Sequence, residues 1–582
     1  MVLVNRLQWL DHGFHKGDSL RSSRRQTMVA GGVAIVCGIF MFTIAMRMAG
    51  PTVHPDEFGF LSNGQALIGH VEAPIPTGSF YPAGYGVVTG LGALLSGSIS
   101  GAYRFSLLVN LLFAVATAWC ASRLATKGLG SSRTIGFIAA CLVFVTPGTI
   151  VTALFAWPET VSRLAFLVFV SSVIGVAKKP TSVRVVLFGL ATGLMPALHG
   201  RFTLLLPIVC VVFCWWGILR FIPRIVAVIG IGVTALGYGG SYALNKFIKG
   251  ALYAEAYDQE NRLLRRLFDP TVWPALLRTM VGQSWYLVAT SFGLVGIAVV
   301  FGISRVRSDG GRKTIATDPA RLGIFVLLSS SLLIIFTGGL QLLYGSRGDH
   351  LIYGRYVEIL VPTLLVLACV GLEHVPQISQ RSLIISSGSI VLVAFLYVLV
   401  DWGDGVKGGY TRNDIVFPNI IGTDIVRYLV EPGLVSFGVV FAMGSMFLWW
   451  MINKTHAWGL VLLVVLLGVG SMYSGQRSIL SRTDDLEATT ETVGIVKSSG
   501  TSLVGFDMGV RNDRSYYYLR YKLHPIRLVR FDISSPAAMI PEKFNCLYGF
   551  PSKPPTGGEW SIVADERVLQ RVLWQRVGAP HC

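Results

Sequence analysis

Long runs of apolar residues constrain this chain more than any other feature of its sequence. A helix needs about 20 mostly apolar residues to cross a bilayer, and runs of that kind recur along most of the chain. We predict about 13 membrane spans, at residues 28–49, 104–122, 135–155, 158–177, 184–198, 202–219, 225–244, 284–303, 322–342, 356–375, 383–401, 434–452 and 457–473. The short runs on either side of His199-Gly200-Arg201 form either two spans or a re-entrant pair. The predicted fold class is therefore a mainly α, polytopic transmembrane helical bundle.

The charge of the chain fits a membrane partner better than a nucleic acid. Charged residues make up only 14% of the 582 residues, against roughly 25% in a soluble domain. The net charge of +18 would indicate nucleic acid as a partner of a soluble protein. Here the charges lie in short clusters between the apolar runs, as in cationic loops that face anionic lipid headgroups. We therefore expect the lipid bilayer, and no nucleic acid, as the partner of these charges.

The distribution of Lys and Arg predicts the orientation of the spans, because cytoplasmic loops are enriched in both residues. Cationic clusters at 123–133 and 305–321 fall on one side, whereas the loop 51–102 contains no Lys or Arg. We expect a multi-pass protein of the plasma (inner) membrane, with a cytoplasmic N-terminus and an extracytoplasmic C-terminus. The chain then divides into a cytoplasmic segment, a membrane domain and an external tail, at 1–27, 28–473 and 474–582.

The tail has a different pattern from the membrane domain. Its sequence predicts strands at 502–507, 526–531 and 560–564, and helices at 514–523 and 566–574. Alternating strands and helices predict a small α/β domain, which this topology places outside the membrane. Because that compartment is oxidising, Cys546 and Cys582 either form a disulfide or remain as two thiols.

An acidic motif follows the first span directly. His54-Pro55-Asp56-Glu57 places two adjacent carboxylates at the membrane surface, in a loop without cations. Asp56 is a candidate general base for a sugar hydroxyl, because a carboxylate is the usual group for that task. Asp56 is equally a candidate cap for a helix that begins near Glu57. No cofactor is required by the sequence, although Asp56 and Glu57 could together bind a divalent cation.

With this motif the chain resembles the GT-C superfamily of membrane glycosyltransferases, whose members carry an acidic motif in the first external loop. The resemblance covers about residues 28–475 and extends to other short motifs in the predicted external regions. These are Tyr81-Pro82-Ala83-Gly84-Tyr85, Arg104, Trp157-Pro158-Glu159, His199-Gly200-Arg201 and Tyr353-Gly354-Arg355-Tyr356. The tail matches no specific family, although some bacterial members, including actinobacterial arabinosyltransferases, end in external domains.

The resemblance implies an inverting transfer of a sugar from a polyprenyl-phosphate donor to a cell-envelope glycan or glycolipid acceptor. It implies Asp56 as the general base, with Glu57 as a second catalytic candidate. Arg201 and Arg355, with Tyr353 and Tyr356, would hold the lipid phosphate, because an Arg fork binds phosphate oxygens in a bidentate manner. The remaining candidates for substrate binding are His54, Tyr81, Tyr85, Glu159 and His199.

Each candidate also has a structural interpretation. An Arg at the end of a span often only reaches to lipid headgroups, and a Glu at a helix start is favoured by the helix dipole alone. A transporter or flippase for a lipid-linked saccharide is the alternative function, and a non-catalytic scaffold is a third. Transporters place ionisable residues near the middle of the bilayer. In this chain nearly all of them map to loops and span ends, which favours the enzyme.

Overall fold

The structure is a computed structural model, and it describes most of the membrane domain and the tail. The described residues are 24–48, 50–51, 55–70, 80–253, 263, 265–307, 315–343, 350, 352–374, 384–396, 420–426, 434–455, 457–480, 491–507, 514–531, 533, 540–566, 570–579 and 582. Within them, seven helices are long and apolar enough to cross a membrane, or up to eight if one bent pair counts as a single span. The chain is thus a polytopic helical protein, and the predicted number of about 13 spans is not confirmed.

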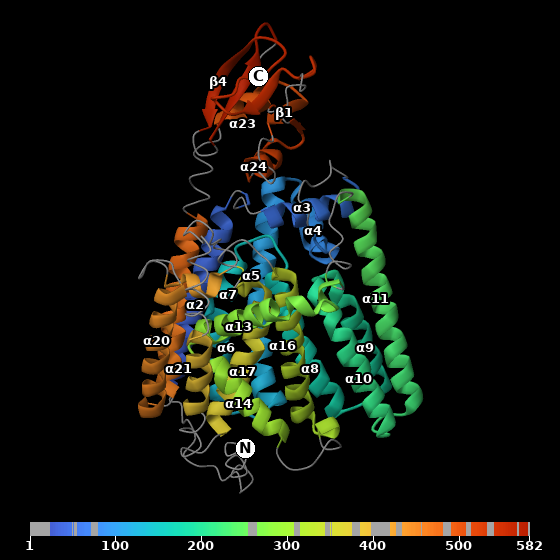
Figure 1. The fold of residues 1–582 in the computed structure, drawn as a ribbon, viewed down its shortest axis with the longest axis vertical. Coiled ribbons are helices and arrows are strands. Elements are labelled where there is room, and N and C mark those ends of the chain that lie inside the picture. The colour runs from blue at the N-terminus through green and yellow to red at the C-terminus, as the bar shows by residue number, and fades with distance from the viewer. Residues whose placement is uncertain are drawn as a thin grey trace.

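Most helices of the bundle run along its long axis (Figure 1). The helices of the bundle are α2 (Arg24–Arg47), α5 (Ile99–Arg123), α6 (Arg133–Val145), α7 (Pro147–Thr152), α8 (Glu159–Lys178), α9 (Ser182–Leu194), α10 (Leu205–Ile218), α11 (Arg224–Leu252), α13 (Trp273–Thr290), α14 (Leu294–Arg307), α16 (Pro319–Leu342), α17 (Val361–His374), α20 (Leu434–Thr455) and α21 (Ala457–Gly475). One large hydrophobic cluster joins residues of these helices. Many large apolar side chains on their outer faces remain exposed, as expected of helices that face lipid.

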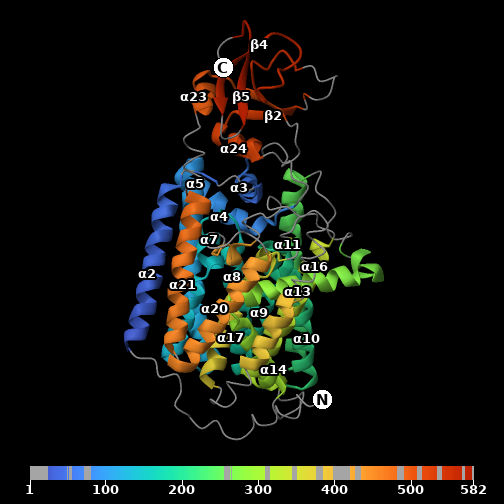
Figure 2. The ribbon, with the colours of Figure 1, turned by 60° about the vertical axis from the view of Figure 1, so that its left-hand side comes forward.

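Two predicted spans are broken. The run 135–155 forms α6 and α7 instead of one helix, because Pro147 lacks an N–H and forces Thr146 into an extended conformation (ψ 144°). The run 284–303 is divided between α13 and α14, which meet at an angle of 108°. Phe292 and Gly293 both have positive φ at that bend. Figures 1 and 2 show α13 lying across the bundle, so an apolar run alone does not reveal a helix's direction.

A cap of short helices covers the end of the bundle nearest the tail. It contains α3 (Pro55–Leu67), the 3-10 turn η2 (Ala83–Tyr85) and α4 (Gly86–Ser96). A second hydrophobic cluster joins this cap to the tail, and its members include Phe58 and Tyr518. The acidic motif at the start of α3 therefore lies between the bundle and the tail (Figure 2).

The tail is a five-stranded sheet with helices α23 (Glu491–Ser498) and α24 (Arg514–Leu523), and α24 lies next to the cap (Figure 1). The strands are β1 (Leu503–Asp507), β2 (Arg527–Phe531), β3 (Cys546–Gly549), β4 (Trp560–Glu566) and β5 (Arg571–Arg576), in the order β2-β1-β3-β5-β4. Strand β1 is parallel to β2 and β3, and β5 is antiparallel to β3 and β4. A disulfide joins Cys546 to Cys582, whose Cα atoms are 5.5 Å apart.

The predicted strands at 502–507, 526–531 and 560–564 and the helix at 514–523 are present as β1, β2, β4 and α24. The predicted helix at 566–574 is wrong, because Glu566 ends β4 and residues 571–574 belong to β5. Strand β5 lies between two others, and its residues from Arg571 to Trp574 are all buried. With both faces covered, the strand lacks the apolar–polar alternation that identifies strands in a sequence. Strand β3, only four residues long, was not predicted.

Candidate active site

The candidate site is built around the side chain of Arg355, which two carboxylates share. Its NH1 group forms an ion pair with Oδ2 of Asp56, and its Nε lies 2.5 Å from Oε1 of Glu159. The other carboxylate oxygen of Asp56 accepts a hydrogen bond from the Tyr81 hydroxyl at 2.6 Å. The guanidinium also lies 4.3 Å above the ring of Trp157. Three segments that are far apart in the sequence therefore meet at one cation.

The partners of Arg355 determine its charge state. Burial by itself lowers the pKa of an Arg, but the Asp56 and Glu159 carboxylates outweigh burial and hold the pKa of Arg355 well above its ordinary value. The guanidinium side chain is 10% exposed, and Glu159 is almost fully buried. Oε2 of Glu159 is buried without a hydrogen-bond partner among the described residues. A polar group of a ligand at this position could therefore donate a hydrogen bond to this oxygen.

Glu57 points away from this cation. Its Oε1 accepts hydrogen bonds from the hydroxyl of Tyr103 and the backbone N–H of Ala156, both at 2.9 Å. The residue is completely buried. Asp56 and Glu57 thus contact different partners, Arg355 and Tyr81 for Asp56 and Tyr103 and Ala156 for Glu57. Among the described residues no group of three or more His, Cys, Asp or Glu side chains could hold a metal ion.

Arg201 is a second cation beside the first. Its guanidinium lies 3.7 Å from the centre of the Tyr356 ring, and its NH1 donates to the carbonyl oxygens of Tyr356 at 3.2 Å and Arg355 at 3.5 Å. Unlike Arg355, it forms no ion pair with any carboxylate in the described part of the chain. Its Nε is buried there without a hydrogen-bond partner. This cation can therefore receive an anionic ligand.

His199 supports the backbone at this second cation. Its Nδ1 accepts a hydrogen bond from the backbone N–H of Arg201 at 3.4 Å, at the start of the 3-10 helix η5 (Gly200–Leu204). Burial, reinforced by the charges of Arg201 and Arg355, holds the pKa of His199 well below its usual value. The imidazole is therefore neutral at neutral pH.

The aromatic candidates divide into two groups. Tyr353 lies beside Tyr356, with ring centroids 4.5 Å apart, in the segment that carries Arg355. Tyr85 is fully buried and donates to Asn110 at 3.1 Å, so it belongs to the packing of the cap. His54 lies outside the described residues.

Comparison with protein-family models and with curated proteins finds no match to this sequence. Comparison with solved structures finds ArnT from Cupriavidus metallidurans. The crystal structure of ArnT bound to undecaprenyl phosphate has a TM-score of 0.55 with this chain at 14% identity, over 96% of this chain and 99% of that chain. For ArnT in the apo state the TM-score is 0.52 at 14% identity, over 93% and 96% of the two chains. ArnT is a member of the GT-C family.

The chain shares the fold of ArnT over nearly its whole length. This confirms the fold that the short motifs in the sequence suggested. Coverage of nearly the whole chain includes the tail, which the sequence resemblance left out.

The helical bundle also contains an ion pair that the sequence did not reveal. Arg163 in α8 forms an ion pair with Oε2 of Glu358 at 3.2 Å, and both are almost fully buried. The hydroxyl of Tyr286 donates to Oε1 of the same Glu358 at 2.6 Å. Arg163 also donates to the backbone oxygen of Gly148. An Arg within an apolar run gives no local signal of its partner, so only the fold could identify this pair.

This buried pair fixes both segments that supply the site. Arg163 lies one helical turn after Glu159 on α8, and Glu358 lies three residues after Arg355. The Arg163–Glu358 contact therefore holds the segments of Glu159 and Arg355 together next to the site. A buried ion pair with its hydrogen bonds satisfied is rigid, and it is costly to break on one side only.

Proposed function

We propose that this protein is a membrane glycosyltransferase that transfers a sugar from a polyprenyl-phosphate donor to a cell-envelope glycan or glycolipid. The observation that supports this most is the convergence of Asp56, Glu159 and Arg355 beside Arg201, in a GT-C fold. The arrangement provides a carboxylate to accept a proton and a separate cation to hold a phosphate.

Asp56 is the proposed general base. It takes the proton of the acceptor hydroxyl, whose oxygen attacks the anomeric carbon from the face opposite the phosphate. The bond between that carbon and the phosphate oxygen breaks, its electron pair stays on the phosphate, and the configuration inverts. Each oxygen of a carboxylate has two lone pairs, so Asp56 can accept the acceptor proton while Arg355 and Tyr81 orient it.

Arg201 is the proposed partner of the lipid phosphate. The leaving phosphate gains charge in the transition state, and a fixed cation at that place lowers the barrier. Of the two Arg candidates, Arg355 is already neutralised by two carboxylates, whereas Arg201 has none within the described residues. We therefore assign the phosphate chiefly to Arg201 and the orientation of Asp56 to Arg355. The crystal structure of ArnT bound to undecaprenyl phosphate supports a lipid phosphate as the ligand class.

Substitution of Asp56 tests this function. We expect Asp56→Asn to lower the rate of transfer about 10²–10⁴-fold, the usual contribution of a general base, while donor binding stays within a few-fold. Glu57→Gln is the matched control, because the new amide oxygen can still accept from Tyr103 and Ala156. Purified protein, a labelled polyprenyl-phosphate sugar and an acceptor glycan give the measurement. Full turnover by Asp56→Asn would exclude this mechanism.

A flippase for a lipid-linked saccharide is the second candidate, and the buried Arg163–Glu358 pair is the observation that favours it. Ionisable residues inside a membrane domain often mark a transport path. Here the hydrogen bonds of Arg163 are made within the protein, since it also donates to the backbone oxygen of Gly148 and to the hydroxyl of Thr152. A flippase would move the donor across a vesicle membrane without cleaving it. Release of polyprenyl phosphate only in the presence of acceptor would decide for the transferase.

A further inference from the structure

We infer that Asn245 is a positioning residue, which sets the spacing between the proposed base, Asp56, and the proposed partner of the lipid phosphate, Arg201. Asn245 lies in α11, near the end of the helix that reaches the cap (Figure 1). Its side chain binds two backbone segments, and each segment leads to one of these groups. The inference rests on the proposed function and adds a residue to it.

Both ends of the Asn245 amide are used. Its Oδ1 accepts a hydrogen bond from the backbone N–H of Ala83 at 2.9 Å, and its Nδ2 donates to the carbonyl oxygen of Pro196 at 3.4 Å. An Asn amide offers an acceptor and donors side by side, whereas an Asp carboxylate offers only acceptors and a Leu side chain offers neither. The amide is therefore matched to this pair of backbone groups, one N–H and one carbonyl.

The first segment holds the base. Ala83 follows Tyr81 by two residues, and the Tyr81 hydroxyl donates to Oδ1 of Asp56 at 2.6 Å. Asn63 in α3 donates to the carbonyl oxygens of Tyr81 at 2.9 Å and Pro82 at 3.3 Å. This segment is thus tied to α3 and to α11, and a shift of its backbone moves the hydroxyl that orients Asp56.

The second segment leads to the cation. Pro196 belongs to the 3-10 helix η4 (Met195–Ala197), which ends four residues before Arg201. The backbone N–H of His199 donates to the carbonyl oxygen of Met195 at 3.3 Å, and the His199 ring accepts from the backbone N–H of Arg201. A shift of η4 therefore reaches Arg201 through two hydrogen bonds.

The two segments also approach each other directly. A Cβ atom on Gly84 would lie 2.6 Å from the carbonyl oxygen of Ala197, so no side chain separates the two backbones at this point. Asn245 joins the same segments one residue away, from Ala83 to Pro196. An error of about 1 Å in the placement of reacting groups costs about 10²-fold in rate. The spacing should therefore govern turnover more than binding.

Substitution of Asn245 tests this role in the purified full chain, with a labelled polyprenyl-phosphate sugar and an acceptor glycan. Asn245→Leu keeps the approximate size and removes both bonds, so kcat should fall about 10–10²-fold. The dissociation constant of the donor should stay within a few-fold, because Arg201 keeps its contact with the Tyr356 ring. Asn245→Asp keeps the acceptor for Ala83, and its kcat should lie between those of Asn245→Leu and the wild type.

A second variant disturbs the same spacing without changing Asn245. Gly84→Ala places a methyl group against the carbonyl of Ala197 and should lower kcat in the same way. Ser241→Ala is the matched control on α11. The Ser241 hydroxyl, one helical turn before Asn245, donates to the carbonyl oxygen of Gly193 at 2.9 Å, outside both segments. Its loss should leave kcat at the wild-type value.

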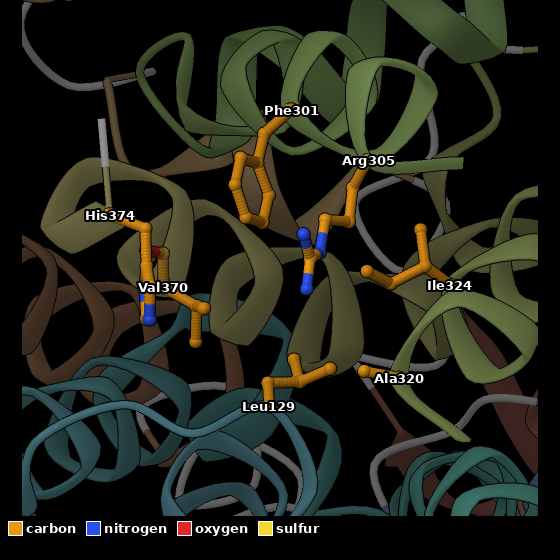
Figure 3. A pocket seen from close by; sticks show the side chains of 7 residues that line it. All are labelled: Leu129, Phe301, Arg305, Ala320, Ile324, Val370 and His374. Carbon is orange, nitrogen blue, oxygen red and sulfur yellow. The ribbon is translucent and has the colours of Figure 1, made fainter. Parts of the chain in front are cut away.

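A further control separates spacing from stability. Ile324 is buried in α16 and lines a cavity of about 210 Å³ together with residues of α14 and α17 (Figure 3). Ile324→Ala should lower the unfolding temperature, because it removes buried methyl groups, and should leave kcat unchanged. A fall of kcat in step with the unfolding temperature across all variants, Ile324→Ala included, would overturn the inference.

The Asp56→Asn background gives the decisive measurement. Residues that act as a unit are not additive, so Asn245→Leu should cost little more once the base is absent. An equal fold-loss of kcat in both backgrounds would show a merely structural role and overturn the inference. Wild-type kcat in Asn245→Leu and Gly84→Ala, with Asp56→Asn inactive, would also overturn it and leave the proposed function intact. Full turnover by Asp56→Asn would instead exclude the proposed mechanism, and the inference with it.

Discussion

Asp56 and Glu57 show how far two neighbouring residues of the same charge can differ in role. Asp56 faces Arg355 at the surface of the site, with a side chain that is 18% exposed, whereas Glu57 is buried against Tyr103. Adjacent residues on a helix point about 100° apart, so one turn of α3 can supply both a chemical group and an anchor. Arg201 and Arg355 also differ in role, because two carboxylates form ion pairs with Arg355 and none in the described residues does so with Arg201.

Arg201 gives the first residue-level prediction. Arg201→Gln should weaken donor binding at least about tenfold, since a hydrogen bond to a charged group contributes about 1.5–3 kcal/mol. The donor affinity of Arg201→Lys should lie between those of the wild type and Arg201→Gln. Lys keeps the charge, but it loses the planar fork and the position over the Tyr356 ring. Arg104→Gln is the control, an Arg near the start of α5 that donates to the carbonyl of Met48 at 3.0 Å. Equal losses in Arg201→Gln and Arg104→Gln would contradict the assignment.

His199 gives a prediction about pH. Its pKa is held below the usual value near 6.5 in the folded state, so the unfolded chain binds more protons as pH falls. The contribution of His199 to the free energy of unfolding is therefore fully present above about pH 6.5. It is lost as the pH falls below that value, by up to roughly 1.4 kcal/mol per pH unit.

The variant His199→Asn should remove this part of the acid sensitivity. Asn can still accept from the backbone N–H of Arg201 and is a favoured N-cap residue. Thermal unfolding in detergent between pH 7.5 and about 5 compares the two proteins. If the unfolding temperatures of the wild type and the variant fell equally with pH, His199 would not be the source of the acid sensitivity.

At the scale of elements, the site depends on how closely the 3-10 helix η8 (Gly354–Tyr356) approaches α13. A Cβ atom on Gly354 would overlap the ring of Tyr286, whereas a Cβ on Gly200 meets nothing within 4 Å. The Tyr286 hydroxyl also accepts from the backbone N–H of Gly422 at 2.7 Å, so this ring cannot move away freely. Helix α13 lies across the bundle because of its bend from α14, and only in that position does it reach η8.

These two glycines give a matched pair of variants. Gly354→Ala should destabilise the protein by about 1–3 kcal/mol through overpacking and displace Arg355, which lowers transfer by about 10²-fold. Gly200→Ala, next to Arg201, should leave both properties close to wild type. Unfolding temperature and initial rate of transfer are measured on the same preparations. An active, stable Gly354→Ala protein would show that the close approach is unimportant.

At the scale of the whole molecule, the tail is continuous with the part that carries the acidic motif. The rings of Phe58 in α3 and Tyr521 in α24 have centroids 6.1 Å apart, and both belong to one hydrophobic cluster. Ile479 and Leu480, which follow the last membrane helix α21, belong to the same cluster. A change in the tail can therefore reach Asp56 through direct packing.

Removal of the tail tests its role in acceptor recognition. A chain that ends after Leu480 should keep its helical membrane part but lose most transfer to the native acceptor. Tyr521→Ala should act in the same direction with the sheet intact, because it removes the contact with Phe58. Val577→Ala, at a side chain that is 54% exposed, is the control. Full activity of the shortened chain on its native acceptor would rule out this role.

Local sequence patterns were enough to predict a polytopic helical membrane protein and most of its elements. Apolar runs had to become helices, because a bilayer leaves no other partner for backbone groups. The acidic motif after the first span and the strands β1, β2 and β4 were likewise predicted from local patterns. The motifs around Arg201 and Arg355 were singled out by their resemblance to GT-C enzymes.

Which of these residues contact one another depends on the fold. Asp56 and Arg355 are 299 residues apart in the chain, and nothing in either segment specifies the other. The same holds for Arg163 and Glu358, for the 108° bend before α14, and for β5, whose neighbours cover both of its faces. Hydrophobicity is a property of single side chains, so a sequence displays it directly. An ion pair or a close approach is a property of two segments, and the fold brings them together.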